Sequence, residues 1–392
     1  MNDLPVALVL SLSASGVAVA RSLAAHKVSV YGADHQFAAG LFSRYIKKPN
    51  FGYQVALDNN FLENLIIFAE AKKLKPVLLP SDDRFMEFVS HHYDILKEHF
   101  ILQESLKPDV CQLFLDKKIF YELCGQHNIK YPKTAFITGQ ESVGDIIHKI
   151  RFPMILKPHI IHKWKRKLRG QKVIMIRNKE ELEIVLNQWR DNLEHMVIQE
   201  VIEGKESDIW IFKGYFNQHG EIIDFFTGRK LRQYPPGFGS ASLAESASND
   251  KIAEISIDFL TQLKFQGLCG TELKYDHRDN EYKIIEINIR PQLWDDLMRV
   301  AGKEILWVAY CDMTGNEITV RSNQMNGIKW GYLTRDILSA LWHMEKNNLL
   351  FSEWIKSYRK LHSEALFDIK DLKMFLGIPL YTFYQFYRYY LS

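Results

Sequence analysis

Apolar positions in the first hundred residues switch between the short runs typical of buried strands and the three-to-four spacing typical of helices. Strands and helices that follow each other in this order predict βαβ units and a parallel sheet. We therefore expect an α/β N-terminal domain. The predicted elements are strands at Val6–Leu10, Lys27–Tyr31 and Pro76–Leu79 and helices at Val17–Ala25, Asn60–Lys72 and Arg84–Lys97.

The turn after the first predicted strand, SLSASG (11–16), raises the question of dinucleotide binding. Asp34, after the second predicted strand, stands where a Rossmann site places the acid that binds the ribose. However, the fingerprint GxGxxG needs three glycines, and this turn contains only Gly16. We therefore expect a Rossmann-like domain with a structural or substrate-contacting role and not an NAD site.

Beyond a boundary near Lys107–Pro108 the pattern predicts two β lobes, each with helices, and a cleft between them. We expect domains at 1–108, 109–320 and 321–392, the last mainly helical. The predicted elements are helices at Cys111–His127 and Lys179–Asn192 and strands at Pro153–Pro158, Val173–Arg177, Ile209–Tyr215 and Glu221–Thr227.

The segment EYKIIEINIRP (281–291) alternates three isoleucines with a carboxylate, an amide and a guanidinium. The preceding HRDNE turn joins it to a strand carrying Glu272, so the two strands form a predicted hairpin. Neighbouring carboxylates repel unless a cation lies between them, which favours a metal site bound to phosphate. The alternative is a solvated face neutralised by Lys274 and Lys283. On the predicted strand, Ile285, Ile287 and Ile289 would face the core, and the opposite face would carry Glu286, Asn288 and Arg290.

Two further motifs fit an anion site in the same cleft. Lys157 lies in PMILKP, an otherwise apolar strand, where a lysine is costly unless it meets an anion. The segment VIQEVIEG (197–204) resembles a hinge whose backbone binds an adenine edge, with Glu206 or Asp208 near the ribose. The alternatives are a strand-end lysine that reaches solvent and an ordinary strand followed by an acidic turn.

These motifs, together with Lys117 in FLDKKIFYELCGQHNIKYPKT, follow the order found in ATP-grasp carboxylate–amine ligases, which the chain resembles to about residue 330. The subgroup it resembles most includes D-aspartate ligase and other predicted ATP-dependent carboligases. The resemblance implies an α+β fold: a Rossmann-like lobe, a two-lobed ATP-grasp domain and a C-terminal helical extension.

The resemblance also assigns roles to residues, with ATP and Mg²⁺ as cofactors and Mn²⁺ as the alternative ion. The metal ligands would be Glu272, Glu286 and Asn288. Arg290, Lys230 and Arg232 would stabilise charge during catalysis or bind the acceptor. The nucleotide would be bound by Lys117, Lys157, Lys172, Gln199, Glu200, Val201, Ile202 and Asp208.

One departure from the family concerns the flap that closes over the phosphates. The corresponding loop, HKWKRKLRGQK, contains Gly170 as its only glycine, so its backbone lacks the usual phosphate cradle. Side chains would replace that cradle, with Lys172 at the strand entry as the main candidate; the alternative is a solvated basic loop. The other candidates are Lys163, Lys165, Arg166 and Arg169.

A second basic segment, TGRKLRQYPPGFGSASLAES (227–246), follows the predicted hinge. Its basic residues precede a Pro-Pro-Gly turn, and the small residues Gly239–Ser242 would let a ligand approach backbone amides. The resemblance favours a site for the acceptor substrate; the alternative is an exposed turn that carries basic side chains.

The reaction implied is the ATP-dependent phosphorylation of a carboxylate, followed by attack of an amine on the acyl phosphate and release of ADP and phosphate. We expect small-molecule substrates, an amino acid among them, in cell-envelope or polysaccharide precursor synthesis. The alternatives are an ATP-grasp carboxylase, a kinase-like enzyme and a non-catalytic nucleotide sensor. The predicted assembly is a monomer or homodimer.

Composition narrows the class of protein. With 392 residues, a net charge of +3, 47% apolar and 25% charged residues, the chain is typical of globular proteins of two or three domains, with no general affinity for nucleic acid. The N-terminal apolar run lacks a basic leader, so it predicts no signal peptide. We expect a cytoplasmic protein with reduced thiols, because no CxxC spacing occurs among Cys111, Cys124, Cys269 and Cys311.

The C-terminal segment FLGIPLYTFYQFYRYYL (375–391) is the most apolar one, yet it contains Pro379, Gln385 and Arg388 and is not expected to span a membrane. We expect a helix that packs on the body of the protein, since aromatic side chains bury large areas. The alternative is a helix that contacts a membrane surface or a lipid-linked substrate.

Overall fold

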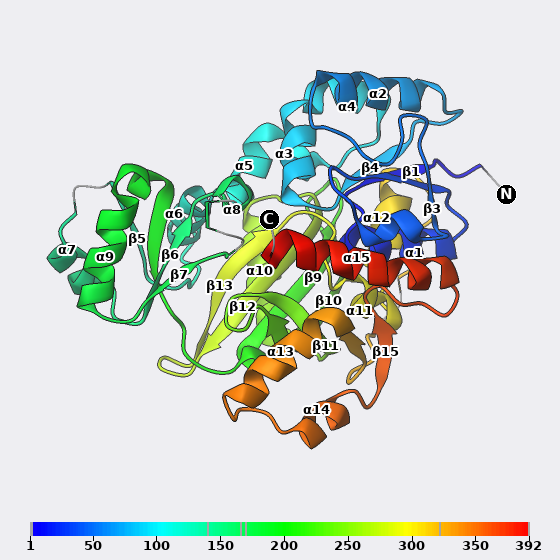
Figure 1. The fold of residues 1–392 in the computed structure, drawn as a ribbon. Coiled ribbons are helices and arrows are strands. Elements are labelled where there is room, and N and C mark those ends of the chain that lie inside the picture. Colours follow the sequence, from blue (N-terminus) through cyan, green and yellow to red (C-terminus); the bar gives the residue numbers. More distant parts are fainter. Residues whose placement is uncertain (1–2, 139–140, 165–166, 169–170, 321–322, 391–392) are drawn as a thin grey trace.

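The computed structural model describes residues 3–138, 141–164, 167–168, 171–320 and 323–390 and builds them around three sheets (Figure 1). Several helices begin where an Asp or Asn side chain accepts a backbone N–H of the first turn. These N-caps are Asp58, Asp82, Asp116, Asn178 and Asn249.

The N-terminal domain is the predicted α/β unit, with four parallel strands in the order β3-β2-β1-β4. Alternate residues of β1 enter two different cores: Ala7 and Val9 face one side of the sheet, whereas Leu8 and Leu10 face the other. Both faces are therefore covered, as expected for a parallel sheet. The elements are β1 (Ala7–Leu10), α1 (Ala14–Ala25), β2 (Val30–Ala33), η1 (Ala39–Phe42), β3 (Ile46–Lys47), α2 (Asn59–Glu70), β4 (Val77–Pro80), α3 (Asp83–His91) and α4 (Tyr93–His99).

Two predicted helices are each divided in two. Arg84–Lys97 is split at His92 into α3 and α4. Cys111–His127 is split at Asp116, whose carboxylate accepts the amides of Lys118 and Ile119 and so starts a new helix. The resulting helices follow a short 3₁₀ turn and lead to the next domain; they are η2 (Glu104–Leu106), α5 (Pro108–Leu115) and α6 (Lys117–Gln126).

A small lobe follows, on the left of Figure 1, with an antiparallel sheet in the order β5-β8-β6-β7 and its own apolar core. Its inward side chains include Leu156, Ile176 and Ile198, one from each of three strands. The elements are β5 (Thr134–Phe136), α7 (Val143–Lys149), β6 (Met154–Pro158), α8 (Ile161–Trp164), β7 (Ile174–Ile176), α9 (Lys179–Trp189), η3 (Arg190–His195) and β8 (Met196–Glu200).

The third sheet is the largest of the three and has seven strands in the order β13-β12-β9-β10-β11-β14-β15. Its last two strands come from the region after residue 320, which is mainly helical but extends this sheet. The elements are η4 (Glu206–Asp208), β9 (Ile209–Phe216), β10 (Ile222–Tyr234), β11 (Ser240–Ser246), α10 (Asp250–Gln262), β12 (Gly267–Asp276), β13 (Glu281–Asn288), α11 (Asp295–Val300), α12 (Ile305–Met313), β14 (Lys329–Gly331), α13 (Leu333–Glu345), α14 (Phe351–Ser357), β15 (Leu361–Glu364) and α15 (Leu372–Tyr390).

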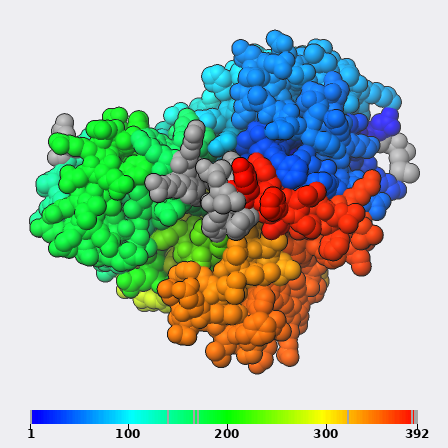
Figure 2. Space-filling view, viewed as in Figure 1, coloured from blue at the N-terminus to red at the C-terminus, as the bar shows by residue number. Residues whose placement is uncertain are grey.

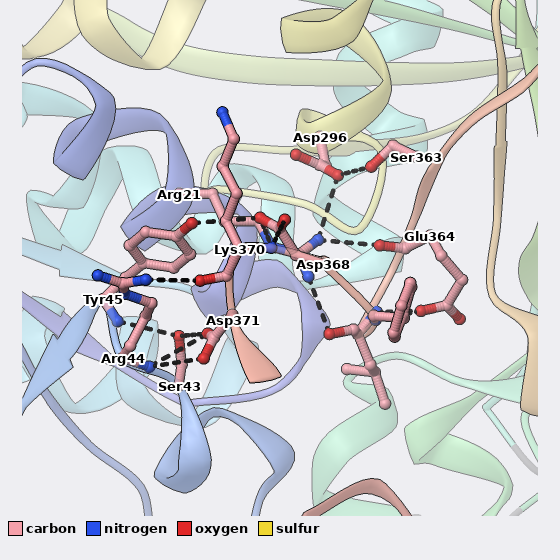
Figure 3. A network of polar contacts seen from close by, with 12 residues as sticks. Arg21, Ser43, Arg44, Tyr45, Asp296, Ser363, Glu364, Asp368, Lys370 and Asp371 are labelled. Carbon is pink, nitrogen blue, oxygen red and sulfur yellow. Dashed lines mark hydrogen bonds and ion pairs between the residues drawn. The ribbon is translucent and has the colours of Figure 1, made fainter. Parts of the chain in front are cut away.

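The segment between β15 and α15 is bound to the N-terminal domain by a polar network (Figure 3). Arg21, on α1, is buried and donates to the carbonyls of Glu364 (2.9 Å) and Leu366 (2.9 Å). Asp371 accepts from the hydroxyl of Ser43 at 2.6 Å and from the amide of Arg44. The two ends of the described chain are thus joined directly.

The last helix packs as expected, since Met374 and Tyr381 are buried against the body of the protein. In Figure 2 it crosses the visible face between the N-terminal domain and the C-terminal helices. Among the described residues, no helix combines the length and the apolar character that a membrane span requires.

Candidate active site

A cavity of about 500 Å³ opens between the N-terminal domain, the small lobe and the seven-stranded sheet. Most of the predicted site residues line it, although the most distant of them, Lys117 and Arg290, lie 173 positions apart in the sequence. These lining residues are Lys117, Lys157, Lys172, Gln199, Glu200, Val201, Ile202, Glu272, Glu286, Asn288 and Arg290.

The predicted metal ligands come together on the hairpin of β12 and β13. Glu272 and Glu286 are cross-strand partners, and the Asn288 amide donates to Glu286 Oε1 at 3.0 Å. Two lysines neutralise the pair: Lys230 Nζ lies 2.8 Å from Glu272 Oε1, and Lys117 Nζ lies 3.1 Å from Glu286 Oε2. Hard oxygen atoms on one pocket wall fit the ligand preference of Mg²⁺.

Lysines 274 and 283 do not neutralise these carboxylates, in contrast to the solvated-face alternative. Lys274 Nζ donates to the carbonyl of Ile202 at 2.7 Å, and Lys283 Nζ pairs with Asp276 at 2.6 Å. Both lysines therefore connect the hairpin to the neighbouring turns and leave the acidic pair facing the cavity.

The positive charges of two nearby lysines keep the Glu286 carboxyl group ionised. Its desolvation alone would raise the pKa, but the positive charges of Lys117 and Lys172 hold the pKa of this carboxyl well below its ordinary range. An ionised carboxylate is the form that binds a metal. The metal-ligand prediction itself stays a prediction, supported by this geometry.

The alternation of the hairpin strand is interrupted at one position. A β-bulge between the Glu272/Glu286 and Leu273/Ile284 pairs inserts Ile285, which lines the cavity beside Glu286 instead of entering the core. The core side is taken by Ile284 and Ile287. The expectation that Ile285 faces the core is therefore wrong, because the extra residue shifts the register by one.

Lys157 is buried at the base of the cavity and makes only neutral contacts through Nζ. It donates to the Tyr121 hydroxyl and to Gln199 Oε1, both at 2.8 Å. Burial, followed by the nearby charge of Lys117, lowers the pKa of Lys157 to about 7. The strand-end alternative, in which this lysine reaches solvent, does not hold.

The predicted hinge, Glu200–Ile202, lines one end of the cavity. Part of its backbone is already paired, since the amide of Glu200 donates to Lys133 O and that of Val201 donates to Pro153 O. The buried Glu200 carboxylate accepts from Arg278 at 3.1 Å, which anchors the hinge to the β12–β13 turn.

The structure does not bring Asp208 to the cavity wall. Its carboxylate accepts the amide of Lys205 at 2.7 Å and lies 3.1 Å from His277. Glu206 is also occupied, by the amides of Gln233 and Gly237. The acidic residue that lines the hinge end is Glu203, which the sequence reasoning passed over although it follows the hinge directly.

The three predicted catalytic cations differ in position. Arg290 lines the cavity and is held by Asp83, whose Oδ1 accepts from Nε at 2.6 Å. Burial opposes the charge of Arg290, but Asp83 raises its pKa overall. Lys230 lies directly behind Glu272, so it positions that carboxylate.

Arg232 points away from the cavity, contrary to its predicted role. It forms a two-bond ion pair with Asp336 of α13 (2.9 and 2.7 Å), and both side chains are buried. Asp336 also accepts from Ser242, Trp354 and Tyr358. Arg232 is therefore structural in this arrangement and connects β10 to the C-terminal helices.

The basic loop at 159–172 contributes Lys172 to the cavity wall. Lys163 instead pairs with Glu87 of α3 at 2.6 Å. The candidates Lys165, Arg166 and Arg169 lie outside the described residues.

Asp34 is fully buried and does not form a ribose site. Its carboxylate accepts the amides of Leu12 (2.6 Å) and Gln36 (3.1 Å), and burial raises its pKa to about 7. Gly16 serves close packing, because a Cβ there would lie 2.0 Å from the carbonyl oxygen of Ser11.

Another part of the cavity wall is formed by residues that the sequence analysis did not assign to the site. Ser13 and Ser15, at the start of α1, come from the N-terminal domain, whereas Tyr332, Arg335 and Tyr381 come from the C-terminal region. The guanidinium of Arg335 lies 4.5 Å from the ring centre of Tyr332. Only the packing of the two chain ends reveals this wall.

Comparisons with known proteins find relatives in sequence and in fold. Residues 115–212 match the RimK-like ATP-grasp domain family. D-aspartate ligase from Enterococcus faecium is 25% identical over 302 residues, which cover 73% of this chain and 71% of that enzyme.

Two solved structures have similar folds. The L-amino acid ligase from Bacillus licheniformis has a TM-score of 0.57 and 11% identity, covering 80% of this chain and 75% of that chain. N5-carboxyaminoimidazole synthetase from Staphylococcus aureus, complexed with ADP, has a TM-score of 0.61 and 15% identity, covering 81% and 80%. The fold expected from the motifs is confirmed, and the chain is similar to ATP-grasp enzymes: residues 115–212 match the RimK-like ATP-grasp domain, and D-aspartate ligase and an L-amino acid ligase are among its relatives in sequence and in fold.

Proposed function

We propose that the protein joins a carboxylate to an amine, with ATP converting the carboxylate into an acyl phosphate and with ADP and phosphate as products. The observation that carries this proposal is the joint cavity. Glu272, Glu286 and Asn288 line this cavity together with Lys157 and Arg290. Such a set neutralises phosphates and needs no protein nucleophile.

Magnesium is the ion that the hairpin fits. Glu272, Glu286 and Asn288 would hold it, because they supply two carboxylates and an amide from adjacent strands. When bound, Mg²⁺ would supply charge neutralisation for the triphosphate; Mn²⁺ is the alternative ion. Lys117 and Lys230, which now pair with the carboxylates, keep both acids aimed at the same place.

Other residues that line the cavity would bind the phosphates and the nucleoside of ATP. Lys157 would bind a phosphate oxygen, and the hinge with Lys274 and Glu203 would bind the nucleoside. Arg290 would stabilise charge on the transferring phosphoryl group, since Asp83 fixes its guanidinium at the cavity. Closure of the surrounding lobes on the bound substrates would exclude water and so protect an acyl phosphate from hydrolysis.

For the substrates, we propose an amino acid whose carboxylate is bound where the two chain ends form the cavity wall. Arg335 is the cation there, next to Tyr332 and Tyr381. A planar guanidinium suits the two oxygens of a carboxylate. Cell-envelope or polysaccharide precursor synthesis is the proposed setting, and the D-aspartate ligase relative supports an amino acid as one substrate.

The test is release of ADP and phosphate with D- and L-amino acids and small amines supplied singly and in pairs. A ligase requires both partners, and a carboxylate labelled with ¹⁸O transfers one label to phosphate. Turnover with bicarbonate alone would indicate a carboxylase, and nucleotide binding without turnover would indicate a sensor. Loss of label transfer in an active enzyme would contradict the acyl-phosphate route.

A further inference from the structure

The C-terminal region exposes an unusual concentration of apolar side chains. Most of the large hydrophobic side chains that the described residues expose lie between Leu333 and Tyr387. We call the set on α13, α15 and the loop before α15 the C-terminal apolar face. Its members are Leu333, Ile337, Leu338, Leu341, Trp342, Phe367, Ile369, Leu372, Phe375, Leu376, Leu380, Phe383 and Tyr387.

The last helix, α15, is apolar on two opposite sides. Met374, Ile378 and Tyr381 turn toward the body of the protein. The outward stripe is spaced by three or four residues, as one helix face requires, and its member Leu376 is 74% exposed. This stripe is Leu372, Leu376, Leu380, Phe383 and Tyr387. Packing on the body therefore leaves a second apolar stripe uncovered.

Helix α13 presents a similar stripe, with Ile337, Leu341 and Trp342 exposed and Asp336 and Ala340 buried. Figure 2 shows the orange C-terminal helices and the red helix α15 on the same side of the molecule. They meet at the cavity, whose wall contains Tyr332, just before α13, and Tyr381 of α15. An apolar surface shared by several elements marks an interaction site and not scattered exposure.

The charges around this face are mostly positive. Four of its acids turn inward: Asp336 pairs with Arg232, Asp371 accepts from Ser43, Asp368 accepts from Tyr45, and Glu364 accepts the amide of Leu333. The exposed acids in residues 333–384 are Glu345 and Glu353. The exposed bases are Lys346, Lys356, Arg359, Lys360, Lys370 and Lys373.

From this charge pattern we infer that the C-terminal apolar face binds the surface of an anionic lipid bilayer. Outward aromatic and aliphatic side chains with flanking lysines and arginines suit the boundary between headgroups and acyl chains. A second copy of the chain is a poorer partner, because a two-fold contact through this face would bring the basic rims together. The bilayer would then lie next to this part of the cavity wall.

The experiment is flotation of the full-length protein with vesicles of phosphatidylcholine, with and without phosphatidylglycerol. It needs neither ATP nor turnover, so its outcome is independent of the proposed reaction. We expect at least tenfold stronger partitioning onto the anionic vesicles. The combined variant Leu376→Ser/Leu380→Ser/Phe383→Ser should lose at least tenfold of that partitioning and keep the wild-type melting temperature.

A matched control removes equally exposed side chains elsewhere: Ile67→Ser/Ile95→Ser/Ile184→Ser should partition like the wild type. If the stripe variant does not fold, Lys370→Gln/Lys373→Gln should reduce binding to anionic vesicles. Absence of wild-type binding, or equal loss in the control, would overturn the inference. The inference would also be overturned if the wild-type protein binds no vesicles but sediments as a dimer, and the stripe variant sediments as a monomer.

Discussion

Replacing Lys157 by methionine should weaken nucleotide binding by an amount that depends on pH. In the free protein, Lys157 Nζ touches only the neutral Tyr121 hydroxyl and Gln199 amide, and burial lowers its pKa to about 7. A bound phosphate favours the charged form. Below pH 7 the free protein already carries that proton, whereas above pH 7 it must take one up on binding.

The magnitude follows from these two states. A hydrogen bond from a charged lysine contributes about 1.5–3 kcal/mol, so the variant should bind roughly 10- to 150-fold more weakly at pH 6. At pH 8, about 90% of the wild-type lysine is neutral before binding, and protonating it costs about 1.4 kcal/mol. The disadvantage of the variant should therefore shrink about tenfold between pH 6 and pH 8.

The assay is isothermal titration calorimetry with ADP in two buffers of different ionisation enthalpy. At pH 8 the wild type should take up about 0.9 proton per nucleotide bound. The Lys157→Met variant supplies the baseline, since it retains the titration of the nucleotide itself. Equal pH slopes for the two proteins would refute the assignment of the buried lysine as the phosphate contact.

Three further outcomes are expected. Glu286→Gln should abolish Mg²⁺-dependent ATP turnover with an unchanged circular dichroism spectrum, because it removes a charged metal ligand; wild-type turnover would contradict that role. Arg335→Gln should raise the KM of one substrate at least tenfold and leave the KM of ATP unchanged, and the reverse pattern in steady-state kinetics would reject the substrate role. Arg232→Met should lower the free energy of unfolding by about 3–5 kcal/mol, measured by urea denaturation, because Asp336 keeps an uncompensated buried charge. A loss below about 1 kcal/mol would refute this last account.

Local sequence patterns predicted the strands that carry the proposed metal and phosphate contacts. Alternation placed Glu286 and Asn288 on one side of a strand, and a single lysine in an apolar run identified Lys157. The bulge at Ile285 was not readable, because the extra residue is required only by the register against β12. The cations on the two glutamates come from Lys117 and Lys230, which no local spacing connects to the hairpin.

The position of Arg232 outside the cavity could not be predicted from local sequence. A basic residue near a small-residue loop has the same local appearance whether it faces a ligand or a buried acid. Asp336 lies 104 positions away from Arg232, so the pairing depends on how α13 crosses β10. The cavity wall with Ser13 and Tyr381 likewise exists only after the chain ends meet.

The polar network around Arg21 has a consequence for how the chain is made. Arg21 lies on α1, yet its partners, including Asp296 and the carbonyl of Leu366, are translated hundreds of codons later. Domains generally fold in order of synthesis, so a nascent N-terminal domain holds this cation without its acceptors. An incomplete chain therefore leaves α1 poorly anchored and the cavity open on one side. Ribosomal stalling before Glu364 and Leu366 are translated should produce protease-sensitive fragments and not enzymes with partial activity.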